Sequence, residues 1–319
     1  MRIGFIGLGN VGFKLANSII ESGFDLLIND LDKNAGKLLI EKGARWMENP
    51  KELAQNSDIS ITCLPSPAIV SSVLEGKEGL IEGMSQGKLW IEMSTTDDKE
   101  MQRLANLVID KKAFAIEAPV SGGCHRAATG NIAILVGGTR EAFDLAMPAL
   151  SAIGHQILRI GPIGSASVLK VATNYLASTH LVAVGEALMV CKKAGLDLPT
   201  VYEGIKISSG NSFVHETESQ VIMNGSYNIN FTMDLVCKDV GLFEKLAQDM
   251  NVPTEVSPLI TKIFKEGREK YGDRAWSSMI VKRLEDACNE DLRAPGYPEE
   301  LVDDTPRCTG YEVIPNNIR

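Results

Sequence analysis

A glycine-rich segment near the amino terminus constrains the fold more than any other part of the sequence. Residues 2–6 are an apolar run typical of a β-strand, and a helical pattern begins shortly after them. Between the two lie Gly7, Leu8, Gly9, Asn10, Val11 and Gly12. In a G-x-G-x-x-G at such a place, the glycines allow a tight turn, a close approach to a pyrophosphate and packing of the helix on the sheet. The helix N-terminus supplies unpaired N–H groups for phosphates, so the segment predicts a dinucleotide site.

An acidic residue follows the second predicted strand. Residues 24–29 are largely apolar, and Asp30 comes directly after them. A carboxylate at this place accepts hydrogen bonds from the ribose hydroxyls of NAD and repels the 2'-phosphate of NADP. The alternative is that Asp30 caps a helix beginning near Lys33. The order of strand, glycine turn and acid favours the ribose role, and NAD is the predicted cofactor.

The composition limits the class of protein. With 319 residues, 44% hydrophobic and 23% charged, we expect a globular chain of two domains. The net charge of −9 argues against nucleic acid and membrane surfaces as partners. A strand beginning at residue 2 leaves no room for a cleaved presequence. The scattered cysteines predict reduced thiols in a cytoplasmic protein and no metal site.

Strands and helices alternate through the first half of the chain. Further strands are predicted at residues 57–65, 88–96, 113–120 and 132–138. Loops at the carboxyl ends of such strands face the cofactor, which places Pro65 and the hydroxyls of residues 94–96 beside it. Ser94 or Thr96 could equally cap the helix from Asp97. After the strand at residues 113–120, Ser121, Gly122 and Gly123 form either an anion-binding nest or a simple turn.

The second half of the chain is helical in pattern. Residues 164–194 predict one long helix that is apolar nearly all round, as expected of a buried helix at a domain junction. Shorter helical patterns follow at residues 198–208, 231–250 and 256–271, without convincing strands.

Together these patterns predict an α/β fold. We expect an N-terminal Rossmann-type doubly wound sheet over residues 1–162, followed by an all-α domain over 163–290 that is joined to it by the long helix. Residues 291–319 are rich in acids and prolines. This acidic extended tail is expected to be either disordered or ordered by lying across another subunit.

Two polar residues interrupt the long apolar helix. Lys170 and Asn174 are four residues apart and therefore share one face. A lysine costs free energy to bury, so Lys170 either reaches water or faces a functional cleft. His180 lies off that face and is expected to be a satisfied structural residue.

With these elements placed, the chain resembles the β-hydroxyacid dehydrogenase family, which includes 3-hydroxyisobutyrate dehydrogenase and tartronate semialdehyde reductase. The resemblance is carried by four segments in the same order as in the family. They are the glycine turn at 7–12, Glu117-Ala118-Pro119-Val120-Ser121-Gly122-Gly123, Gly161-Pro162-Ile163-Gly164 with Lys170 and Asn174, and Lys238-Asp239-Val240-Gly241-Leu242.

The resemblance implies a role for each matching residue. Lys170 matches the catalytic lysine and Asn174 the asparagine that holds the substrate, while residues 121–123 match the loop that receives the substrate carboxylate. Lys238 matches a lysine near both cofactor and substrate. The implied cofactor contacts are Gly7, Gly9, Asn10, Val11, Gly12, Asp30, Leu64, Pro65, Thr95 and Lys238.

The implied reaction is NAD-dependent interconversion of a short 3-hydroxyacid and its semialdehyde. Lys170 would accept the hydroxyl proton as a neutral amine and return it as an ammonium. Alternatives are a reductase of small aldehydes such as glyoxylate or succinic semialdehyde, and a non-catalytic NAD-binding scaffold. The scaffold alternative does not explain a buried lysine, because burying it costs free energy and binding of NAD alone does not require it. The apolar surface of the helices predicts a homodimer or homotetramer.

The residues after the carboxylate loop depart from the small residues of 3-hydroxyisobutyrate dehydrogenases. They include His125 and Arg126, which would add positive charge beside the substrate if both turned into the cleft. The equally weighted alternative is that Arg126 points to solvent. A cleft-facing pair predicts polar acids of the tartronate semialdehyde or glycerate type as better substrates than 3-hydroxyisobutyrate.

Overall fold

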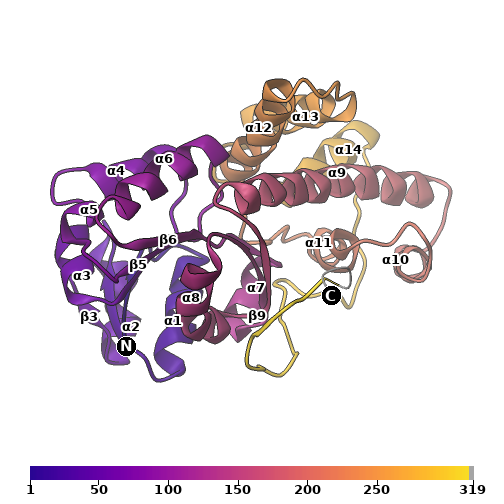
Figure 1. Ribbon diagram of the computed structural model, residues 1–319. Coiled ribbons are helices and arrows are strands. Elements are labelled where there is room, and N and C mark those ends of the chain that lie inside the picture. Colours follow the sequence, from indigo (N-terminus) through magenta and orange to yellow (C-terminus); the bar gives the residue numbers. More distant parts are fainter. Residues whose placement is uncertain (316–319) are drawn as a thin grey trace. The chain divides into compact units, whose positions relative to one another are not determined.

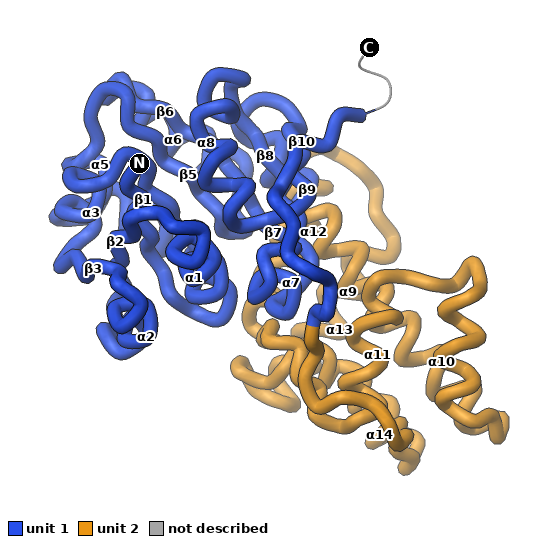
Figure 2. Tube along the Cα trace, turned by 90° about the horizontal axis from the view of Figure 1, so that it is seen from below, with its two compact units in different colours: residues 1–170, 303–319 blue, residues 171–302 orange. Residues whose placement is uncertain are grey.

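The computed structural model describes residues 1–315 and divides the chain into two compact units. Unit 1 contains residues 1–170 together with the segment from Asp303 onward, and unit 2 contains residues 171–302 (Figure 2). The separation between the units falls inside a long helix, whereas the sequence suggested a division at residue 162. The chain therefore passes from one unit to the other twice.

Unit 1 is built on a ten-stranded sheet with the strand order β10-β9-β8-β6-β5-β4-β1-β2-β3, and β7 pairs with β8. The strands are β1 Arg2–Ile6, β2 Asp25–Asn29, β3 Arg45–Trp46, β4 Ile59–Thr62, β5 Leu89–Glu92, β6 Phe114–Glu117, β7 Val120–Ser121, β8 Ile132–Gly137, β9 Gly154–Gly161 and β10 Tyr311–Glu312. From β3 to β6 the strands are parallel and follow the order of a dinucleotide-binding sheet. β8 runs antiparallel to β6.

Helices cover both faces of this sheet (Figure 1). They are α1 Gly12–Glu21, η1 Lys33–Gly36, α2 Lys37–Glu41, α3 Pro50–Asn56, α4 Pro67–Glu75, α5 Leu80–Gly83, α6 Asp98–Ile109, α7 Gly123–Thr129 and α8 Arg140–Ile153. In β5, Ile91 belongs to the core cluster under α1 and α8, and Trp90 to the one under α4 and α6. This alternation buries the strand on both faces, so the predicted doubly wound arrangement is confirmed.

Unit 2 is helical. Its helices are α9 Ser165–Lys193, which begins in unit 1, then α10 Leu198–Lys206, α11 Phe213–Asn224, α12 Met233–Asp249, α13 Val256–Tyr271, η2 Ser277–Val281 and α14 Lys282–Cys288. Residues 171–302 contain no strand, only an isolated bridge between Thr232 and Trp276. Within residues 1–315, no helix combines the length and the apolar character that crossing a membrane requires.

One face of α9 is exposed, which differs from the helix predicted to be buried nearly all round. Five exposed residues recur at alternating intervals of four and three, and they are Leu176, His180, Ala183, Ala187 and Val190. Glu186 and Lys193 of α9 are also exposed. Leu176 is 51% exposed and Val190 69% exposed. His180, which the sequence predicted to be a satisfied structural residue, lies on this exposed row.

The first part of the acidic tail packs within unit 2. Leu292 is fully buried, and the Arg293 guanidinium lies 2.8 Å from the Glu285 carboxylate. Arg293 also donates to the Tyr227 hydroxyl at 2.6 Å. Together these contacts tie the segment after α14 to the helices of the same unit.

The last part of the tail packs in unit 1. Asp303 accepts hydrogen bonds from Thr129 and Asn131, and Arg307 donates to the Ala152 carbonyl. β10 then pairs with β9 and extends the sheet by one strand (Figure 2). Residues 291–315 thus pack against their own chain, unlike the disordered alternative, and their contact with another subunit stays a prediction.

Candidate functional site

The glycine turn lies at the carboxyl end of β1, and each glycine has its own steric reason. Gly7 has a φ of +96°, and a Cβ there would come within 2.3 Å of the Cys63 carbonyl oxygen. A Cβ on Gly12 would lie 2.0 Å from the Gly7 carbonyl oxygen, so the first turn of α1 rests on the backbone of the turn. A Cβ on Gly9 would meet nothing within 4 Å. The open backbone at Gly9 fits a pyrophosphate at the N-terminus of α1.

Asp30 fastens the end of β2 to the glycine turn. Its carboxylate accepts hydrogen bonds from the Leu8 N–H at 2.6 Å and from the Asp32 N–H at 2.9 Å. The cap of the following helix η1 is Asp32, which accepts from the Asn34 N–H. Asp30 is therefore not the helix cap that the sequence left open, and its role toward the ribose stays a prediction.

The loops after β4 and β5 are joined to each other. The Leu64 N–H donates to the Ser94 hydroxyl at 2.7 Å, and the Ser94 N–H donates to the Glu92 carboxylate at 2.6 Å. In the same two loops Pro65 is exposed and Thr95 is half-buried. The cap of α6 is Asp97, so neither Ser94 nor Thr96 has the capping role that the sequence allowed.

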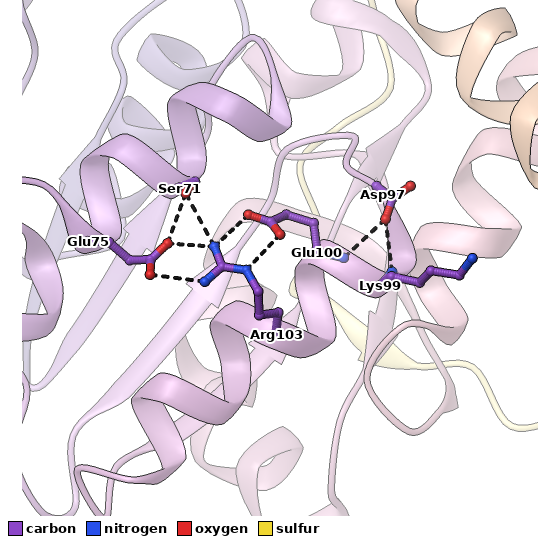
Figure 3. A network of polar contacts seen from close by, with 6 residues as sticks. All are labelled: Ser71, Glu75, Asp97, Lys99, Glu100 and Arg103. Atoms are coloured by element: carbon purple, nitrogen blue, oxygen red, sulfur yellow. Dashed lines mark hydrogen bonds and ion pairs between the residues drawn. The ribbon is translucent and has the colours of Figure 1, made fainter.

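The helices that follow these two loops are also linked. Figure 3 shows Arg103 of α6 between Glu75 of α4 and Glu100, with contacts of 3.0 Å from Nη1 to Glu75 Oε1 and 2.8 Å from Nε to Glu100 Oε2. Asp97 accepts from the Lys99 and Glu100 N–H groups at the start of α6. Such half-exposed ion pairs contribute only about 0–1 kcal/mol. Their effect is to orient α4 against α6.

The loop at residues 121–123 is a turn that only glycine adopts easily. Gly122 has a φ of +127° and Gly123 a φ of +83°, and they are the N-cap and the first residue of the short helix α7. The side chains of the next residues lie against this turn, since a Cβ on Gly122 would lie 3.2 Å from Arg126 Cδ and one on Gly123 2.9 Å from His125 Cε1. Arg126 is exposed and His125 half-buried.

The two side chains beside this loop differ in charge. Burial lowers the pKa of His125, and the Arg126 guanidinium lowers it further, against the opposing effect of Asp303. His125 is therefore neutral at neutral pH, and Arg126 supplies the positive charge next to the loop. The sequence had assigned that charge to the pair.

Two buried acids lie side by side at the carboxyl edge of the sheet. Glu92 of β5 and Glu117 of β6 are register partners, and both are fully buried. Burial raises the pKa of Glu92 to about 7, although hydrogen bonds from Ser94 and Thr62 act in the opposite direction. Burial also raises the pKa of Glu117, which is opposed by its bonds with Ser167 and neighbouring N–H groups. Glu117 has more donors, so it is the acid better suited to hold a charge.

Lys170 lies in the second turn of α9 at the end of unit 1. It is 7% exposed, so its side chain does not extend into solvent as the alternative required. Asn174 follows one turn later, in unit 2. The sequence placed both residues on one face, and the continuous helix over residues 165–193 keeps that spacing.

Unit 2 contributes an acid that the sequence analysis did not single out. Asp239 of α12 is buried and accepts a hydrogen bond from Asn174 Nδ2 at 2.5 Å. Its other carboxylate oxygen lies 2.8 Å from Lys238 Nζ. Asp239 therefore fixes the two unit 2 residues to which the family resemblance gives roles. In the sequence, only the position of Asp239 next to Lys238 could have indicated this role.

Residues 1–315 contain no group of three or more His, Cys, Asp or Glu side chains arranged to hold a metal ion. All six cysteines lie within this range and all are free thiols.

Two family models match this chain over most of its length. Residues 2–161 match the NAD binding domain of 6-phosphogluconate dehydrogenase, which covers the sheet of unit 1. Residues 164–284 match the family described as NAD-binding of NADP-dependent 3-hydroxyisobutyrate dehydrogenase.

Curated relatives span most of the chain. The 2-(hydroxymethyl)glutarate dehydrogenase of Eubacterium barkeri is 32% identical over 88% of this chain and 94% of its own. The L-threonate dehydrogenase of Cupriavidus necator is 30% identical over 82% and 89%. A crystal structure of 3-hydroxyisobutyrate dehydrogenase from Salmonella typhimurium, 27% identical, superposes with a TM-score of 0.81 over 89% of this chain and 99% of that one. The chain belongs to the β-hydroxyacid dehydrogenase family and is an NAD(P)-dependent hydroxyacid dehydrogenase.

Proposed function

We propose that the enzyme interconverts a short 3-hydroxyacid and its semialdehyde, with Lys170 as general acid and base. The observation that carries this proposal is a lysine only 7% exposed one turn before Asn174 on a continuous helix. Burying a lysine costs free energy of folding, so a buried lysine indicates a functional role. The relatives named as dehydrogenases along most of the chain leave no reason to retain a non-catalytic scaffold.

A dinucleotide bound at the glycine turn would supply the acceptor for the hydride of the hydroxyl-bearing carbon. Lys170 Nζ accepts the hydroxyl proton during oxidation and returns it to the carbonyl oxygen during reduction. Asn174 Nδ2 donates one hydrogen bond to Asp239, and the second N–H of the same amide would donate to the substrate's hydroxyl oxygen without competing with Lys170 for the hydroxyl proton. Asp239 thus orients Asn174 and Lys238 at once.

The remaining residues are proposed to hold the two ligands. Ser121 and the N–H groups of Gly122 and Gly123 would bind the substrate carboxylate. The glycine turn, Asp30 and the loops at Leu64–Pro65 and Thr95 would bind the dinucleotide. A substrate fixed at its carboxylate meets the nicotinamide in one orientation, which is worth several orders of magnitude in rate. The free thiols fit the predicted cytoplasmic location.

The guanidinium of Arg126 gives an expectation about the substrate. The aliphatic part of the Arg126 side chain lies against the turn proposed to hold the carboxylate. Two relatives are named for glutarate and threonate derivatives, acids with further polar groups. We expect kcat/KM for acids of the tartronate semialdehyde or glycerate type to exceed that for 3-hydroxyisobutyrate. Arg126→Ala should reduce this preference, because one charged hydrogen bond is worth about 1.5–3 kcal/mol.

The comparison is made by steady-state kinetics of both substrate classes in wild type and Arg126→Ala. Lys99→Ala serves as a control that removes a positive charge from the start of another helix in unit 1. If 3-hydroxyisobutyrate is the better substrate and Arg126→Ala changes neither value, the guanidinium belongs to the surface. The substrate would then have to be sought among apolar hydroxyacids.

We also propose that the protein assembles as a homodimer or homotetramer through the exposed row on α9. The alternation of four and three residues along this row is the spacing at which two helices pack along their length. Its alanines allow close approach of a second helix. Ala183→Arg should therefore shift the molar mass measured by light scattering toward that of a monomer.

The matched control is Ile207→Arg, which places the same charge on a side chain that is 86% exposed and lies off the row. It should leave the molar mass unchanged. A wild-type protein that is monomeric at micromolar concentration, or equal behaviour of the two variants, would exclude this interface.

A further inference from the structure

Glu117 binds the beginning of the helix that carries Lys170. Its carboxylate oxygens accept hydrogen bonds from the backbone N–H groups of Gly164 at 2.6 Å, Ala166 at 2.8 Å and Ser167 at 3.0 Å, and from the Ser167 hydroxyl. A negative charge at this end of a helix also interacts favourably with the helix dipole. The cap of α9 is thus supplied by a strand about fifty residues earlier in the chain, within the same unit.

The surroundings of Glu117 are shaped around its carboxylate. A Cβ on Gly137 would lie 2.2 Å from Glu117 Oε1, so β8 has room for the acid only because this residue is glycine. Gly164, the first of the donors, has a φ of +98°, which disfavours other residues. The contact therefore requires glycine at two positions, at Gly137 for space and at Gly164 for the backbone conformation.

The position of Lys170 follows from this contact. Ala166 and Ser167 precede Lys170 by four and three residues, so all three are neighbours on the surface of α9. Fixing the N–H groups of the first turn of α9 determines the position of the next turn along the helix axis and its rotation about that axis. The buried lysine projects from this next turn. A displacement of about 1 Å at a reacting group can cost about 100-fold in rate.

The neighbouring acid holds the segments on the cofactor side. Glu92, the register partner of Glu117, accepts from the Ser94 N–H at 2.6 Å and the Thr62 hydroxyl at 2.5 Å. Ser94 in turn binds the Leu64 N–H. Two adjacent strands thus end in acids that hold, within unit 1, the loops after β4 and β5 and the first turn of α9.

We propose that Glu117 is a positioning residue of the reaction, which fixes Lys170 relative to the dinucleotide-binding edge of the sheet. This inference rests on the proposed role of Lys170. Replacing Glu117 by Gln leaves one acceptor oxygen and turns an amide toward N–H groups, so the first turn of α9 loses its fixed place. The chemical step should slow while the cofactor site, held by other residues, remains.

The test compares Glu117→Gln and Glu117→Asp with wild type. For Glu117→Gln we expect kcat to fall by about 10- to 100-fold, with the NADH dissociation constant from fluorescence titration within about threefold of wild type. The primary isotope effect on kcat, with substrate deuterated at the hydride-donating carbon, should increase. Glu117→Asp keeps the charge and should lie between the two.

Asp197→Asn is the matched control for loss of a helix cap. Asp197 accepts from the Thr200 N–H and hydroxyl at the start of α10, as Glu117 does at α9, but has no part in the site. The control should lower Tm without changing the isotope effect. If Glu117→Gln keeps wild-type kcat, or loses NADH binding and activity together with an unchanged isotope effect, the inference is overturned. If Glu117→Gln does not fold, Glu117→Asp is judged by the same criteria.

The Lys170→Ala variant separates this inference from the proposed function. Wild-type turnover in Lys170→Ala would reject the lysine mechanism itself. Loss of turnover there, together with wild-type kcat in Glu117→Gln, would reject only the positioning role.

Discussion

Lys170→Ala should lower kcat by about 100- to 10,000-fold, the range typical of general acid–base groups. The variant loses the group proposed to exchange a proton with the substrate oxygen, and no water easily replaces it at a position only 7% exposed. NADH binding should stay close to that of wild type, because the glycine turn, Asp30 and the loop at Leu64 are untouched. Stopped-flow or steady-state kinetics, with fluorescence titration of NADH, measures both quantities.

The control for this experiment is Lys192→Ala, at the other end of the same helix. Lys192 lies 4.0 Å from Glu290 and has no place in the proposed mechanism. It should retain wild-type kcat. Turnover in Lys170→Ala that matches this control would remove the lysine mechanism, whatever the identity of the substrate.

The wild-type enzyme should use NAD about tenfold or more efficiently than NADP. A 2'-phosphate near the Asp30 carboxylate would be repelled, and about 1.4 kcal/mol of repulsion already gives a tenfold difference. Asp30→Ala should reduce the preference for NAD over NADP. The structure adds that this variant also loses the bond to the Leu8 N–H, so it should bind both cofactors less tightly.

Asp30→Asn separates the two effects, because an amide oxygen can still accept from Leu8 while the charge is gone. We expect it to narrow the preference with a smaller loss of NAD affinity than Asp30→Ala. Comparable kcat/KM values for NAD and NADP in wild type would show that Asp30 serves only to fasten the glycine turn.

Local patterns sufficed to predict β1, the glycine turn, α1 and β2. The glycine turn and Asp30 are separated by one helix and one strand, and their order alone predicts their place. The helix caps were harder to assign, because Asp30 and Asp32, or Thr96 and Asp97, are alike in chemistry. Which residue of each pair caps the following helix depends on where the backbone leaves the preceding strand.

Contacts between distant residues account for what the sequence did not show. Two helices lie in the chain between Asn174 and Asp239, and three strands and two helices lie between Glu117 and Ser167. The pairing of β10 with β9 joins residues far apart in a segment too polar and proline-rich to resemble a strand. The hydrophobic periodicity of the sequence does not predict such contacts, since they depend on the tertiary fold.

The most direct test of the account is the formation of NADH by the purified protein with a panel of short 3-hydroxyacids, followed by absorbance. We predict NAD-dependent turnover of at least one acid that carries the hydroxyl on the carbon beta to its carboxylate, and loss of that turnover in Lys170→Ala. Binding of NADH without oxidation of any 3-hydroxyacid, or reduction of any corresponding semialdehyde, would contradict it.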